Sequence, residues 1–159
     1  MRHTLAALLL LLASCAVRTG QPLPPFSVQD LDGHTWTAAA LRGHPAVIDL
    51  WSPACLACVS ELPAFKAMAE ELGPKGLVVL GLYEHGGTAA GRSIADSAEL
   101  GFPLAHAGGT LMWKLGGTSV PTTLFVDSSG RVRHVFHGTR SWADLFAQAE
   151  ALLPSAAQP

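Results

Sequence analysis

Two cysteines, Cys55 and Cys58, are separated by two residues at the point where an apolar run gives way to a helical pattern. A cysteine in the first turn of a helix meets unpaired backbone N–H groups and the positive end of the helix dipole, which favour the thiolate. The pKa of the Cys55 thiol should therefore lie below its free value of about 8.5. Cys58, one turn deeper on the same face, can attack a mixed disulfide formed at Cys55. The spacing predicts a nucleophile, Cys55, and a resolving thiol, Cys58.

Two other uses of this spacing have to be weighed. A C-x-x-C pair is half of a zinc site, but the chain has no second C-x-x-C or C-x-x-H, and its seven histidines are scattered singly. A structural zinc site needs four ligands, so a zinc site is disfavoured. A purely structural disulfide is also possible, although closing so short a loop stabilises a fold little. The strand–helix context favours redox chemistry, with neither a metal nor a cofactor expected.

Asp49 lies inside the apolar run that precedes the cysteines. A carboxylate is costly to bury unless it is paired or functional. Burial should raise the pKa of Asp49, which makes the residue a candidate proton acceptor for Cys58 near neutral pH. The alternative is an Asp hydrogen-bonded at a strand end. Trp51, at the end of the same run, is expected to pack under the loop that carries Cys55.

The elements around the pair follow an α/β pattern. The run 46–51 is almost continuously apolar and is bounded by prolines, as in a strand buried on both faces. A helix over 55–72 should follow it and end at a Gly-Pro pair. The remaining patterns predict a short strand over 26–28 and further strands over 76–82, 122–126 and 131–136. They also predict helices over 88–100 and 141–153. This order predicts a mixed central β-sheet flanked by helices on both faces.

The N-terminus has the character of a targeting signal. Leu5–Ala13 is a nine-residue apolar run, too short for a bilayer, which takes about 20 residues, but of the length of a signal-peptide core. It ends in Leu12-Ala13-Ser14-Cys15, which resembles the bacterial lipobox. We therefore predict lipidation of Cys15, with a plain secretory signal as the alternative.

These features divide the chain into four parts. We expect a lipoprotein signal peptide over 1–14, a lipidated cysteine and flexible, proline-rich tether over 15–25, one domain over 26–153 and a tail over 154–159. The formal net charge is −2, so composition gives no sign of a nucleic-acid partner or of attraction to an anionic membrane.

The motifs together resemble the thioredoxin superfamily and, within it, the bacterial membrane-anchored TlpA/ResA-like thiol–disulfide oxidoreductases. The resemblance covers about residues 26–153. The matching features are a strand ending in Ile48-Asp49-Leu50-Trp51, then Ser52-Pro53-Ala54 and the C-x-x-C helix, and far downstream Ser119-Val120-Pro121-Thr122, Gly130 and Gly138.

The resemblance implies a thioredoxin-like fold, a redox-active Cys55–Cys58 disulfide and a set of client-binding residues. Pro121 matches the family's cis-proline, which faces the disulfide and leaves the backbone of Val120 free to pair with a substrate strand. Thr122 and Trp51 complete the substrate-binding set. Asp49 matches the buried acid through which thioredoxins move protons to and from the inner cysteine.

The chain departs from the family on either side of the first cysteine. An aromatic residue usually precedes the first cysteine and a proline often precedes the second, but here these positions hold Ala54 and Ala57. With Leu56 they form an apolar site without a His or a charge that would stabilise the thiolate further. Since a stabilised reduced form makes an oxidant, this site favours a reductant.

The implied function is an extracytoplasmic reductase of disulfides in exported client proteins, supplied with electrons by a membrane or envelope donor. Such a protein would be a monomer held in the bacterial cell envelope by its lipid anchor. A peroxidase is disfavoured, because its motif P-x-x-x-[TS]-x-x-C would need proline where Ile48 stands, although Ser52 fits. A copper-delivery protein using both thiols and a histidine such as His85 is the non-enzymatic alternative.

Overall fold

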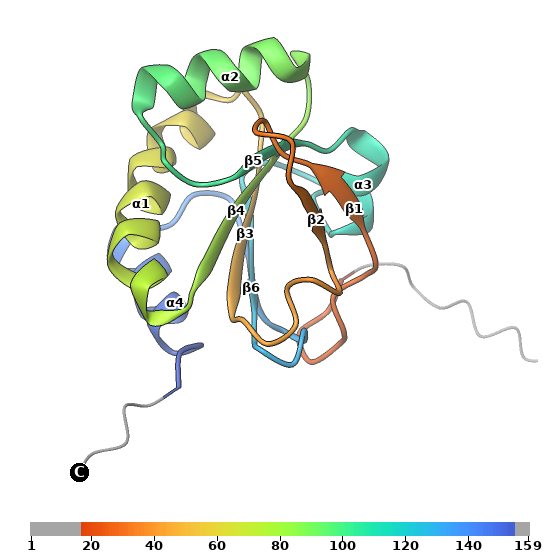
Figure 1. The fold of residues 1–159 in the computed structure, drawn as a ribbon, viewed down its shortest axis with the longest axis vertical. Helices are drawn as coiled ribbons and strands as arrows, with labels where there is room; N and C mark the ends of the chain where they lie inside the picture. The colour runs from red at the N-terminus through yellow and green to blue at the C-terminus, as the bar shows by residue number, and fades with distance from the viewer. Residues whose placement is uncertain (1–16, 155–159) are drawn as a thin grey trace, which may run out of the picture.

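The computed structural model describes residues 17–154 of the 159-residue chain, and its centre is one mixed sheet (Figure 1). The strand order is β5–β4–β3–β6–β7, in which β3, β4 and β5 are parallel and β6 is antiparallel to both of its neighbours. The strands are β3 (Ala46–Trp51), β4 (Val78–Tyr83), β5 (Leu104–His106), β6 (Thr122–Val126) and β7 (Val132–His137).

The central strand β3 is buried at all six of its residues. Because successive side chains of a strand point to opposite faces, its residues divide between two cores. Val47 and Trp51 belong to the core beneath α1 (Leu56–Leu72), whereas Ile48 and Leu50 belong to the core on the other face. The apolar run is thus long and continuous because both faces of β3 are covered.

Helices cover both faces of the sheet, as predicted. On the Trp51 side lie α1, α2 (Gly87–Ala98) and α4 (Trp142–Glu150), with the 3-10 turn η1 (Gly73–Lys75) closing α1. On the other side lie α3 (Gly109–Lys114) and a separate antiparallel hairpin, β1 (Ser27–Gln29) with β2 (Thr35–Thr37). The expectation of a mixed sheet between two helical layers is confirmed.

Three short elements were not predicted, namely β2, β5 and α3. β5 has three residues and follows Pro103, so it is too short to show a period. α3 has six residues and begins after Gly108 without a capping side chain, and such a start carries no sequence signal. Tertiary contacts rather than local propensity define these elements: β5 pairs with β4, and Met112 of α3 enters the core.

The N-terminal strap, residues 17–23, differs from the flexible tether that its composition predicts. Gly20 N–H donates to the Val132 carbonyl over 2.7 Å, and Val132 N–H donates to the Gln21 carbonyl over 2.9 Å. Leu23 is 6% exposed and joins the core shared with α3. The strap therefore lies along the outer edge of β7, because hydrogen bonds to an open strand edge outweigh the lack of local propensity.

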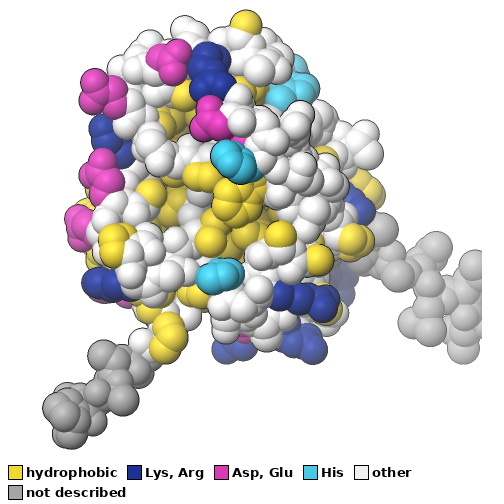
Figure 2. All heavy atoms as spheres, in the orientation of Figure 1, with side chains coloured by type: hydrophobic (Ala, Val, Ile, Leu, Met, Phe, Trp, Pro, Cys, Tyr) yellow, Lys and Arg dark blue, Asp and Glu magenta, His cyan; other side chains and the backbone are white. Residues whose placement is uncertain are grey.

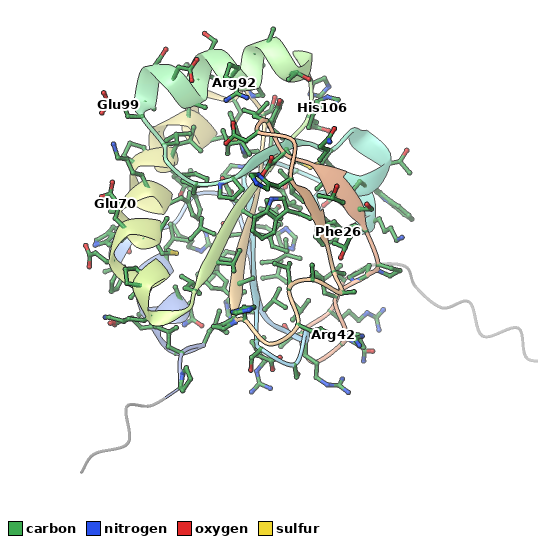
Figure 3. All side chains as sticks on the ribbon, viewed as in Figure 1. Phe26, Arg42, Glu70, Arg92, Glu99 and His106 are labelled. Atoms are coloured by element: carbon green, nitrogen blue, oxygen red, sulfur yellow. A yellow bond between two sulfur atoms is a disulfide. The ribbon has the colours of Figure 1, made fainter. Side chains whose placement is uncertain are left out.

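The hairpin β1–β2 is tied to α2 across a cleft. Arg92 of α2 points toward the hairpin turn, where Nη1 lies 3.0 Å from Asp32 Oδ1 and Nη2 donates to the Leu31 carbonyl (Figure 3). The cleft below this contact measures about 840 Å³. Its floor is hydrophobic, and acidic side chains gather along α1 and α2 beside it (Figure 2). Within the described chain its lining includes neither cysteine nor Pro121.

Leu23→Ala tests whether the strap belongs to the folded domain. Loss of this buried side chain should lower the free energy of unfolding by about 2–4 kcal/mol, measured by urea denaturation of the oxidised protein. Gln21→Ala, at an exposed position of the same strap, is the matched control and should change it by less than about 0.5 kcal/mol. Equal stability of the two variants would mean that residues 17–23 act as a free tether.

Candidate active site

The Cys55–Cys58 pair lies at the start of α1 and forms a disulfide, with the two Cα atoms 5.2 Å apart. Cys55 is the N-cap, one position ahead of the helical first turn, and its Sγ accepts the Cys58 N–H over 3.2 Å. Cys55 is partly exposed, whereas Cys58 is 1% exposed. Only the first sulfur is open to a partner, and it receives a backbone N–H that stabilises negative charge.

The segment before β6 reaches the same end of the sheet as this pair. Leu50 of β3 pairs with Thr122 of β6, so the residues that follow Leu50 and those that precede Thr122 meet at one end of the sheet. The Val120–Pro121 peptide bond is cis, and Val120 packs against the core cluster of Cys58. Among the described residues, the N–H and C=O of Val120 have no backbone partner, so both groups are available to an extended chain.

Trp51 and Thr122, predicted as substrate-binding residues, support this face from beneath it. Trp51 is fully buried, with its ring centroid 5.4 Å from that of Tyr83, so its side chain presents no surface to a client. Thr122 is also fully buried, and its hydroxyl donates to the Ser119 carbonyl over 2.7 Å. That bond shapes the loop that carries Pro121.

Asp49 lies on the α1 side of β3. It stands between Val47 and Trp51 on the same face of the strand, and both of these residues face α1. Asp49 is 1% exposed. Its Oδ1 has no hydrogen-bond partner among the described residues. Burial, and secondarily the negative charge of Glu61, raise the pKa of Asp49 well above its ordinary value. The buried acid expected from the sequence is therefore in place.

Glu61 is a second buried acid, and the sequence patterns did not reveal it. It lies on α1 one turn beyond Cys58, is 9% exposed, and its Oε1 accepts the Arg140 N–H over 2.7 Å. Burial raises the pKa of Glu61, and the hydrogen bond and charge of Arg140 partly offset this. The available signal was its spacing, because a Glu three residues after Cys58 falls on the helix face that also buries Leu62 and Phe65.

This arrangement can separate electron transfer from proton transfer. An exposed sulfur with a stabilised thiolate can attack a disulfide, while the buried sulfur must lose its proton before it can attack in turn. Burial raises the pKa of both carboxyl groups, which makes each a better acceptor for that proton than an exposed carboxylate. The site therefore supports dithiol–disulfide exchange without a bound cofactor.

A metal site is not preformed in residues 17–154, where no three His, Cys, Asp or Glu side chains stand together. His85 is exposed, and its Nδ1 lies 3.6 Å from Glu84 Oε1. Cys15 lies outside the described residues.

Comparison with known proteins places these features in a family. The model of the AhpC/TSA family matches residues 19–135. The thiol:disulfide interchange protein DsbE of Pseudomonas fluorescens biotype C is 32% identical over 144 residues, covering 86% of this chain and 79% of the relative. The thiol-disulfide oxidoreductase ResA of Bacillus thuringiensis is 24% identical over 136 residues, covering 85% of this chain and 79% of the relative.

A solved structure agrees with the fold. The structure of MTB DsbF in its mixed oxidised and reduced forms is 28% identical and superimposes with a TM-score of 0.73. The match covers 80% of this chain and 94% of that chain. The predicted thioredoxin-like fold is thereby confirmed.

Asp49→Asn should raise the stability of the oxidised protein, increasingly so toward alkaline pH. The folded protein holds a proton on Asp49 that the unfolded chain releases near pH 4. Its stability therefore falls as the pH rises through the range between those two pKa values, by about 1.4 kcal/mol for each unit that separates them. Asn keeps the shape without the charge, so this loss should disappear.

The measurement is the free energy of unfolding of both proteins in urea at pH 4 and pH 8. A gain at pH 8 that exceeds the gain at pH 4 is expected. A gain independent of pH would show that Asp49 carries no raised pKa.

Proposed function

We propose that this chain, which belongs to the AhpC/TSA family and is a thiol–disulfide oxidoreductase, reduces disulfides of client proteins outside the cytoplasm. One observation carries the proposal: a partly exposed Cys55 caps α1 one turn before a buried Cys58, at the end of the sheet where the cis Val120–Pro121 bond leads into β6. The buried acid Asp49 lies on the face of β3 that α1 covers.

The reaction proceeds by two exchanges. The Cys55 thiolate attacks a client disulfide, so that an intermolecular S–S bond forms, the client S–S bond breaks, and one client thiolate leaves and takes up a proton. Cys58 gives its proton to the buried carboxylate of Asp49 and attacks the Cys55 sulfur. The second client thiolate is released, and two electrons have passed from the cysteine pair to the client. A thiol donor in the envelope then reduces the Cys55–Cys58 disulfide.

The residues between the cysteines support the reducing direction. Leu56 is 88% exposed and Ala57 is exposed, and neither side chain can donate a hydrogen bond to the Cys55 sulfur. The thiolate therefore depends on the helix start and the Cys58 N–H. A modestly stabilised thiolate makes the pair a better electron donor than a strongly stabilised one would be.

The surface around Pro121 supports an extended client chain. The free N–H and C=O of Val120 can pair with a client backbone by β-augmentation. Near the Pro121 loop a pocket of about 180 Å³ is lined by Trp113, Thr118 and His137 among others. Trp113 is 58% exposed, so an apolar client side chain can bury part of it.

A trapping experiment tests the proposed roles of the cysteines. Cys58→Ala, expressed in the native envelope, should accumulate mixed disulfides through Cys55, because the resolving thiol is missing. The adducts are measured by non-reducing electrophoresis and mass spectrometry. Cys55→Ala is the matched control and should form almost none, because Cys58 is buried.

The same variants distinguish the proposed reductase from a peroxidase. Absence of adducts, together with failure of the wild-type protein to reduce insulin, would overturn the reductase proposal. Turnover of peroxide by the wild-type protein, lost in Cys55→Ala, would instead indicate a peroxidase. That outcome is not expected, because Ile48 stands where the peroxidase motif needs proline and is buried within β3.

For the location, we propose a lipoprotein anchored through Cys15. The support is the sequence Leu12-Ala13-Ser14-Cys15 after a short apolar run. Within residues 17–154, none of the helices has the length and hydropathy needed to cross a bilayer. A diacylglycerol on a cysteine thiol anchors a protein at a membrane surface.

Cys15→Ser should prevent lipidation, so the variant should no longer fractionate with membranes. Intact protein from the wild-type strain should fractionate with membranes and carry a lipid mass on Cys15 at its N-terminus. The serine variant should lack that mass. If both proteins are soluble in the envelope and begin at a residue other than Cys15, a plain secretory signal is the correct interpretation.

A further inference from the structure

The buried carboxylate of Glu61 has a partner that no proton-transfer role requires. Its Oε1 accepts the backbone N–H of Arg140, 79 positions away, over 2.7 Å. Arg140 directs its side chain elsewhere, with its guanidinium 4.9 Å from the centroid of the Phe136 ring and Nη1 donating to the Thr139 carbonyl. The contact with Glu61 is therefore made through the backbone of the β7–α4 loop, residues 138–141.

The other end of that loop is bonded to the cis-proline. Gly138 N–H donates to the Pro121 carbonyl over 2.8 Å. Between the two bonds the loop has only Thr139, and after Arg140 it enters α4 through the Ser141 cap. A short continuous path therefore runs from the helix that carries the cysteines, through residues 138–140, to the carbonyl of Pro121.

We propose that Glu61 is a positioning residue, a latch that holds the β7–α4 loop and through it fixes the cis-proline segment relative to the Cys55–Cys58 pair. The inference rests on the proposed function, since it assigns the geometry of client binding to that same site. The register between β3 and β6 brings the two sides of the site together. The Gly138 bond continues the pairing of β7 with β6 by one position, and the Glu61 bond then ties this end of β7 to α1.

The latch is well placed to act on an extended client. A chain that pairs with Val120 must also bring a sulfur to Cys55, so a small displacement of Pro121 shifts the sulfur from its line of attack. A small disulfide makes no backbone pairing and needs no such alignment. The two kinds of substrate should therefore depend on Glu61 to different extents.

Two variants separate the effect of the hydrogen bond to Arg140 from the effect of the Glu61 charge. Glu61→Gln keeps a side-chain oxygen that can accept the Arg140 N–H, while it removes the titratable group. Glu61→Met keeps the length of the side chain but offers no acceptor at that position. Asp49→Asn is the matched control, because it removes the other buried carboxyl and leaves the loop contact intact.

The first readout is amide hydrogen exchange of the oxidised protein by NMR, which needs no client. In Glu61→Met the Arg140 amide should exchange about 10- to 100-fold faster, as expected for a lost bond to a charged group, and the Gly138 amide should become faster with it. Both should remain at their wild-type rates in Glu61→Gln and Asp49→Asn. A Gly138 amide that keeps its wild-type rate in Glu61→Met would overturn the proposal, because the loop would not connect the two sites.

The second readout compares insulin with hydroxyethyl disulfide as oxidants of the reduced enzyme. Glu61→Met should raise KM for insulin about tenfold and leave that for hydroxyethyl disulfide within about twofold, and Glu61→Gln should restore the insulin value. Equal losses with both substrates, or an insulin KM that Gln fails to restore, would overturn the latch. If no variant, nor the wild type, reduces either substrate, the proposed reductase function fails while the exchange data still decide the latch.

Discussion

The antiparallel register between β3 and β6 is the constraint on which the rest of the site depends. Because Leu50 pairs with Thr122, two segments about 70 positions apart in the chain end at the same edge of the sheet. One continues into the helix that carries the cysteines, and the other arrives through the cis bond before Pro121. A slip of one residue in this pairing would reverse the faces of every β6 side chain and would turn Thr122 away from the loop that it braces.

Burial of acidic groups under the cysteines has a cost that packing must offset. Asp49 has an unpaired oxygen among the described residues, and Trp51 Nε1 and the Tyr83 hydroxyl next to it are also unpaired. Such groups destabilise a fold. They lie in the core beneath α1, where the aromatic side chains of Trp51, Tyr83, Phe65 and Phe125 are fully buried. The domain thus combines a strongly packed core with a few groups that are kept for chemistry rather than for stability.

Much of this site could be predicted from the sequence, and the exceptions share a cause. β3, α1 and Asp49 were predictable because a long apolar run, a Gly-Pro stop and a charge inside a buried strand are local signals. The cis bond at Pro121 followed from resemblance. Glu61 was missed because an acid on a helix ordinarily faces solvent, and here only the packing of α1 against the β7–α4 loop buries it. The strap was missed because prolines suppress local structure, whereas the open edge of β7 supplies hydrogen-bond partners that lie about 110 positions away.

The strap also determines how far the domain can stand from an anchor. Along the chain, Val17 is only two residues from Cys15, a span of at most about 7 Å. A free tether over 16–25 would instead have allowed a reach of roughly 35 Å. With its lipid at Cys15, the domain would be held at the headgroup layer and restricted in its rotation. Its effective concentration toward a membrane-bound electron donor would be high, and clients would have to approach Cys55 from the sides that the membrane leaves open.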